Sequence, residues 1–100
     1  MLVLRWQAPT PPSAAQIKLI FESEGHDAIE EVVIKGQKHI EKRHPFCEVR
    51  FIVSGELYLS IGGTQLLLRA GDRIEIPANT KHSYWTLNES VLNYYIHLPC

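Results

Sequence analysis

Three side chains of this sequence are of the kinds that hold metal ions in proteins. His44 stands four residues before Glu48 in the stretch KRHPFCEVR, and His82 occurs later, in PANTKHSY. Two imidazoles and one carboxylate form a triad that suits divalent iron and similar metals and leaves coordination positions open. Each of the three residues, taken alone, is more typical of a surface or hydrogen-bonded side chain. The prediction of a metal site therefore depends on the fold bringing them together.

Two cationic residues lie two positions away from members of this group. Lys42 precedes His44 by two positions, and Arg50 follows Glu48 by two. Alternate residues of a strand share one face, so a strand without a bulge near Pro45 would turn all four side chains toward the interior. Arg50 is informative because a charge inside a sheet needs a partner or a ligand. The opposite face is expected to pack against another layer through Val49, Phe51 and Val53.

Lys42 leaves two interpretations of the site open. A protonated lysine cannot ligate a metal, and its charge at ~5 Å from a divalent ion would cost roughly 6–7 kcal/mol at an effective dielectric of ~20. The side chain can swing out, lose its proton, or occupy a site without metal. Without metal, Lys42 and Arg50 against Glu48 leave a net charge of about +1, which favours a small molecule bearing a carboxylate or phosphate.

Two other histidines are weaker candidates. His39 could replace a ligand only through a β-bulge, and we expect it to be exposed. His97 alternates with Tyr95 in NYYIHL, so it lies either against the pocket or in the core. We group His97 with Lys42 and Arg50 as candidate substrate-binding residues. No catalytic residue is assigned, because the sequence has neither a G-x-S-x-G nucleophile motif nor a phosphate-binding loop that would indicate an organic cofactor.

Turn residues divide the chain into short β-rich segments. One helix is predicted over residues 11–25, with Thr10 or Ser13 as its cap and Gly25 at its end. Gly62 and Gly63 are typical of a tight hairpin turn. Eight or nine short strands and a single helix predict an all-β sandwich or barrel. The strands named from the pattern cover residues 2–6, 28–35, 47–54, 56–61, 64–69, 73–76, 81–87 and 91–98.

Composition excludes several classes of partner. The formal net charge is −1 and no cationic run is present, so we expect no nucleic-acid binding. No apolar run approaches the ~20 residues of a membrane span, and the amino terminus lacks the features of a signal peptide, so a cytoplasmic location is predicted. Cys47 and Cys100 are expected to be reduced thiols, with a reactive Cys47 or a dimer-linking Cys100 as the alternatives.

The spacing of glycines and polar residues resembles the two motifs of the cupin superfamily. The resemblance covers residues 36 to about 86, half of the chain, and implies a small single-domain type-2 cupin. The expected fold is a cupin-type jelly-roll β-barrel with one short N-terminal helix. The single domain spans residues 1–100, with an N-terminal strand, helix and strand in 1–35 and the barrel with both motifs in 36–100. The matching residues are Gly36, Lys42-Arg43-His44, Glu48 and Gly55, then Gly71, Pro77-Ala78-Asn79 and His82.

The resemblance also implies a ligand set. Cupins usually bind metal through two histidines and a glutamate of the first motif and a histidine of the second. Carried over by position, these are Lys42, His44, Glu48 and His82, so lysine replaces the first histidine. The other three would hold a divalent metal such as iron, manganese, nickel or zinc. Asn79 replaces a usual glycine, which its tolerance of left-handed backbone explains.

These observations predict a small cupin-like protein that binds a divalent metal, a small polar and anionic molecule, or both. One hypothesis is a metal-dependent enzyme of unassigned reaction. A second is a non-enzymatic binding or sensor module with a degenerate, metal-free site, and a third is a purely structural or interaction role. Cupins are often dimeric, and we expect a homodimer formed through the edge of the strand at residues 2–6.

Overall fold

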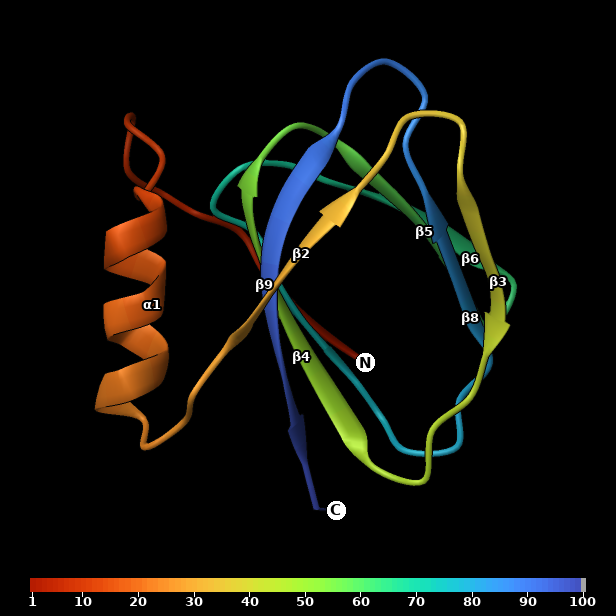
Figure 1. Cartoon of the computed structure of the whole chain (residues 1–100). Coiled ribbons are helices and arrows are strands. Elements are labelled where there is room, and N and C mark those ends of the chain that lie inside the picture. Colours follow the sequence, from red (N-terminus) through yellow and green to blue (C-terminus); the bar gives the residue numbers. More distant parts are fainter. Residues whose placement is uncertain (100) are drawn as a thin grey trace.

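Two antiparallel sheets pack face to face in a jelly-roll, as predicted (Figure 1). The computed structural model describes residues 1–99, apart from the side chains of residues 40–42. One sheet has the strand order β1-β7-β4-β9-β2, and the other has the order β3-β8-β5-β6. The bounds are β1 Leu2–Leu4, β2 Ile29–Val33, β3 Lys38–Lys42, β4 Cys47–Ser54, β5 Leu57–Ile61, β6 Thr64–Leu68, β7 Arg73–Ile76, β8 His82–Trp85 and β9 Val91–Leu98.

The central strand β4 separates two apolar layers. Its even-numbered residues Glu48, Arg50 and Ile52 are buried and face the space between the sheets, where Ile52 joins the inner core. Val49 and Phe51 face outward and pack in a second cluster with the helix. The predicted alternation is confirmed from Glu48 to Ile52, but Lys42 and His44 do not lie on this strand, because Lys42 ends β3 in the other sheet and His44 is in the loop before β4. The alternation sends two charged side chains into the interior of the molecule.

The single helix α1, Ala14–Ser23, covers the outer face of the five-stranded sheet (Figure 1). Ser13 caps it, and Gln16 completes a capping box by accepting a hydrogen bond from the Ser13 backbone N–H. Phe21 is fully buried and meets Phe51 edge-on, with ring centroids 6.0 Å apart. The helix thus holds β4 from outside, and its buried residues belong to the outer cluster and not to the one between the sheets.

Turn geometry follows the sequence expectations. Gly62 and Gly63 have φ of 55° and 81° in the β5–β6 hairpin, and Asn79 has φ of 57° between β7 and β8. Gly71 has a φ of 92° and also leaves room for Trp6, because a Cβ at Gly71 would lie 2.5 Å from Trp6 Cβ. These turns fix where β8 begins and therefore where His82 lies.

The cysteine prediction is wrong for Cys47, which is disulfide-bonded. The chain's other cysteine, Cys100, lies outside the described residues. The expectation of a cytoplasmic location therefore loses the support that reduced cysteines would have given it. Within residues 1–99, no helix has the length and apolar character needed to cross a membrane.

Candidate metal centre

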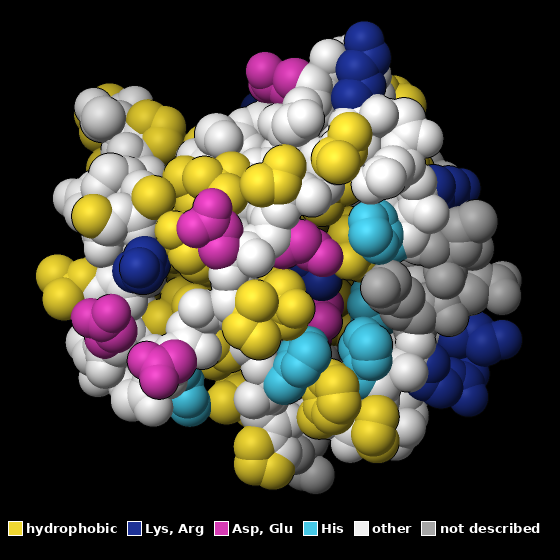
Figure 2. Space-filling view, viewed as in Figure 1, with side chains coloured by type: hydrophobic (Ala, Val, Ile, Leu, Met, Phe, Trp, Pro, Cys, Tyr) yellow, Lys and Arg dark blue, Asp and Glu magenta, His cyan; other side chains and the backbone are white. Residues whose placement is uncertain are grey.

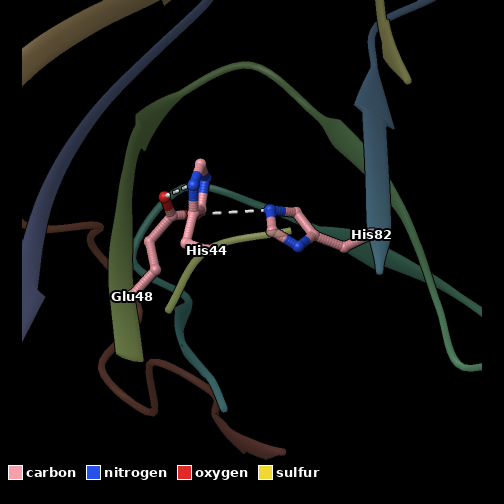
Figure 3. A group of neighbouring side chains, drawn as sticks. All are labelled: His44, Glu48 and His82. Atoms are coloured by element: carbon pink, nitrogen blue, oxygen red, sulfur yellow. Dashed lines mark ion pairs between the residues drawn. The ribbon is translucent and has the colours of Figure 1, made fainter. Parts of the chain in front are cut away.

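His44, Glu48 and His82 converge between the two sheets (Figure 3). His44 comes from the loop before β4, Glu48 from β4 itself, and His82 from the first position of β8. One ligand atom of each lies within 4.8 Å of the others. The Nε2 atoms of His44 and His82 are 3.8 and 3.7 Å from Glu48 Oε1 and Oε2. Two ligands on one metal ion are at most about 4.2–4.4 Å apart, so the group needs only a small contraction.

Backbone contacts fix the two histidines relative to each other. The Asn79 N–H donates to the His44 carbonyl over 2.6 Å, which ties the loop before β4 to the turn before β8. His82 is paired with Ile61 on β5 and with Lys42 on β3. Both histidines are therefore held by the chain segments next to them.

The ring of His82 is oriented as a metal ligand would be. Its Nδ1 lies 3.0 Å from the Thr80 carbonyl, and because a carbonyl oxygen only accepts, Nδ1 carries the proton. In the neutral ring the lone pair is then on Nε2, which is buried and has no hydrogen-bond partner among the described residues. The 3.7 Å to Glu48 is an ion-pair distance and too long for a hydrogen bond. A buried atom left unpaired costs about 1–3 kcal/mol, and ligation would satisfy it.

Glu48 is ionised although it is almost fully buried. Arg50 Nε donates to Glu48 Oε2 over 2.8 Å, and His97 Nε2 lies 3.1 Å from Glu48 Oε1. Burial by itself would raise the pKa of Glu48, but the charge and hydrogen bond of Arg50, with the contribution of His97, lower it below its usual value. The carboxylate therefore carries its charge at neutral pH.

Arg50 is enclosed by partners of its own. Its Nη1 donates to Glu31 Oε1 over 2.5 Å and to Asn93 Oδ1 over 2.7 Å. The guanidinium also lies 4.4 Å from the ring centre of Tyr84 and 4.9 Å from that of Tyr95. Burial opposes its charge, but the two carboxylates raise the pKa of Arg50 further. The substrate-binding role expected of Arg50 stays a prediction, and the hydrogen bonds given for its guanidinium all go to groups of the protein.

Glu31 is the site residue that the sequence interpretation missed. It enters from β2, where its backbone is paired with that of Asn93 on β9. Tyr84 Oη donates to Glu31 Oε2 over 3.0 Å. Burial would raise the pKa of Glu31, but Arg50 outweighs it and the pKa is lowered. A signal was present, because Glu31 alternates with Val33, which lies in the inner core.

Glu31 also changes the charge of the site. With neutral imidazoles, its charge and that of Glu48 against Arg50 leave the described part of the pocket with one negative charge. The sequence had suggested about +1, from Lys42 and Arg50 against Glu48. The side chain of Lys42 lies outside the described residues, so its predicted place beside the metal stays a prediction. A pocket of negative charge favours a cation.

The pocket itself is small. Histidines surround a hollow, and acidic and basic side chains are visible within it (Figure 2). Its volume is about 90 Å³. Two larger hollows, of about 650 and 340 Å³, lie elsewhere on the surface and include none of the three candidate ligands. The pocket is lined by Glu31, His44, Glu48, Arg50, Tyr84, Tyr95 and His97.

The remaining histidines lie beside the site. His97 lines the pocket, with its side chain 35% exposed, and its ring centre is 4.2 Å from that of Phe46 and 5.2 Å from that of Tyr95. His39 stacks on Tyr84 at 4.4 Å. A register shift does occur between His39 and Lys42, but the cluster of ligating atoms in the described residues does not include His39.

Known proteins with similar sequences and folds share this architecture. Residues 29–95 match the family described as the Cupin domain. Two proteins named acireductone dioxygenase are similar: one from Bacillus licheniformis is 37% identical over 91 residues (76% of this chain, 50% of that protein), and one from Exiguobacterium sibiricum is 38% identical over 76 residues (71% and 41%). The chain thus spans about half the length of the curated relatives it matches.

The solved structures agree on the fold. A cupin 2 conserved barrel domain protein from Salinispora arenicola superimposes with a TM-score of 0.67 and 21% identity, covering 74% of this chain and 63% of that one. At that identity the likeness concerns the fold alone. It supports the jelly-roll described above.

Proposed function

Because the chain belongs to the cupin domain family, we propose that it binds one divalent transition metal through His44, Glu48 and His82 and acts there on a small polar molecule. Iron, manganese, nickel and zinc are the candidate metals, since all accept imidazole and carboxylate ligands. The proposal extends the family assignment to one site and one type of chemistry.

A single observation carries this proposal. His82 Nε2 is buried, would carry the lone pair of a neutral imidazole and lies beside an ionised carboxylate without a hydrogen-bond partner among the described residues. A histidine that served only the core would be expected to use both ring nitrogens. Metal ligands are typically held as His82 is, with the other nitrogen donating to a backbone carbonyl.

The class of reaction is suggested by the ligand type and by the relatives. A metal bound by two histidines and one carboxylate would supply open positions at which a substrate oxygen is polarised. The two curated relatives bear the name acireductone dioxygenase, so a dioxygenase reaction on a small polar molecule is the first class to test. We retain Lys42, Arg50 and His97 as candidate substrate-binding residues. His97 supports this role best, because its ring is in the pocket and partly open to solvent.

The test is a direct search for metal. Protein purified without a chelating column should contain close to one equivalent of a transition metal. Stripped protein should gain thermal stability when iron, manganese, nickel or zinc is added, by about 2.7 kcal/mol at a metal concentration of 100 Kd. Absence of bound metal together with no gain from any of the four ions would contradict the proposal.

The metal-free alternative makes a different prediction. A non-enzymatic anion-binding module would be stabilised by a small carboxylate or phosphate even in the presence of a chelator, and Arg50→Glu would abolish the effect. The negative charge of the described pocket gives this alternative less support. Stabilisation by anions that survives the chelator would favour it over the metal site.

We also propose a homodimer formed through β1. This strand is at one edge of the five-stranded sheet, so one side of its backbone has no neighbouring strand within the described part of the chain. Such an edge can pair with a second copy.

A further inference from the structure

Building on the proposed metal site, we propose that Glu31 is a positioning residue that shares the charge of Arg50 and so leaves the charge of Glu48 available to the metal. The metal site itself is the premise of this inference. What is added is a residue from β2 that acts on the metal through another side chain, outside the ligand set described above.

Arg50 joins the two carboxylates through separate nitrogen atoms. Its Nε donates to Glu48 Oε2, and its Nη1 donates to Glu31 Oε1. The guanidinium is 3% exposed and lies beside the rings of Tyr84 and Tyr95, so it has little room to move away from either partner. A change in the charge of Glu31 therefore changes how strongly Arg50 interacts with Glu48.

The charges explain why a second carboxylate is needed. One guanidinium beside one buried carboxylate is a neutral pair, and its positive half would repel an arriving cation. With Glu31 on the far side, the three groups keep one negative charge between them. Glu48 can then accept from Arg50 at one oxygen, while its other oxygen, Oε1, lies 3.1 Å from His97 Nε2 and 3.8 Å from His44 Nε2.

Hydrogen bonds from two other strands hold Glu31 in place. Tyr84 Oη donates to its Oε2 over 3.0 Å, and Asn93 Nδ2 donates to its backbone carbonyl over 3.1 Å. Asn93 is fully buried and also accepts from Arg50. Strand β9 thus fixes the backbone of Glu31, and β8 fixes its carboxylate.

The chain offers a matched pair of variants on the same strand. Glu31→Gln keeps the shape of the side chain and removes its charge. Glu30→Gln removes the same charge from the neighbouring residue, which is exposed and accepts a hydrogen bond from Tyr94 instead of Arg50. Glu31→Asp keeps the charge on a shorter side chain. Nickel binding to the stripped, full-length protein is measured by titration calorimetry, and the unfolding free energy of each metal-free protein is measured with urea.

We expect Glu31→Gln to weaken nickel binding by about 10–100-fold, the usual effect of losing a residue that supports a metal ligand. Glu30→Gln should bind like the wild type, and Glu31→Asp should recover most of the affinity. If Glu31→Gln does not fold, Tyr84→Phe provides the second test, because it removes the hydrogen bond to Glu31 Oε2 and should weaken binding in the same direction.

Three results would overturn the inference while leaving the metal site intact. In the first, Glu31→Gln binds nickel as the wild type does. In the second, Glu30→Gln weakens binding equally, which would indicate only a general effect of net charge. In the third, Glu31→Asp is as weak as Glu31→Gln, so that a negative charge at this position does not restore binding. A wild-type protein that binds none of the four metals would overturn the proposed function, and this inference with it.

Discussion

At the scale of single residues, the site contains groups that a purely structural interior would not keep. His82 has a buried nitrogen without a hydrogen-bond partner among the described residues, and Glu48 and Arg50 place opposite charges inside the sheets. Apolar residues of similar volume often serve as well as a buried ion pair, or better. Retaining these groups is therefore more typical of a binding site than of a core.

Replacing His82 separates stability from metal binding. His82→Leu loses the hydrogen bond to Thr80 but also removes the unpaired Nε2, and the two effects offset each other. We expect the unfolding free energy of the metal-free protein to change by less than about 1 kcal/mol. The gain in melting temperature on adding metal should disappear.

His39→Phe is the control for this experiment. It also removes an imidazole near the site, and it keeps an aromatic ring where His39 stacks on Tyr84. Its response to metal should equal that of the wild type. A full metal response in His82→Leu, or none in His39→Phe, would show that the ligands are wrongly assigned.

At the scale of elements, the turn between β7 and β8 organises the site. It carries Thr80, which orients the His82 ring, and Asn79, whose N–H donates to the carbonyl of His44. Asn79 does this with a positive φ of 57°, a conformation that asparagine and glycine adopt most readily. One short turn thereby positions both histidines.

Substitutions at Asn79 test this turn. Asn79→Ala should destabilise the metal-free protein by about 1 kcal/mol, because alanine is strained at positive φ. Asn79→Gly should match the wild type, since glycine adopts this conformation freely. Urea unfolding curves give both values, and equal stability of the alanine and glycine variants would contradict the explanation.

The sequence predicted the turns and strands correctly where the residue types of a short segment determine its conformation. Glycine and asparagine turns and the alternation along β4 placed Glu48 and Arg50 correctly in the interior. Strand β3 was not named separately, because KHIEK lacks a clear apolar alternation. Glu31 was missed because it follows another glutamate, and only the pairing of β2 with β9 decides which of the two faces Arg50.

At the scale of the whole molecule, the sheet order leaves β1 at an edge with exposed apolar side chains. Leu2 is 48% exposed and Leu4 is 50% exposed. Both flank Val3, which packs partly against the inner core. An edge of this kind tends to pair with another chain unless it is protected.

We predict that the protein sediments as a dimer at micromolar concentration and that Leu4→Glu makes it a monomer. A charge on the edge strand would oppose pairing with a second copy. Leu19→Glu is the matched control, because Leu19 lies on α1 and is 64% exposed, so the same substitution there should leave the dimer intact. A wild-type monomer would contradict the prediction.

The modest volume of the hollow between the sheets has a consequence for which molecules could react there. A space of about 90 Å³ encloses only the reacting end of a metabolite, and the remainder has to extend past the partly open imidazole of His97 into water. Recognition would then depend on the reacting end of the molecule, and the site would discriminate little among molecules that differ only in the remainder. Compounds that share this end and differ in chain length would compete for one and the same place.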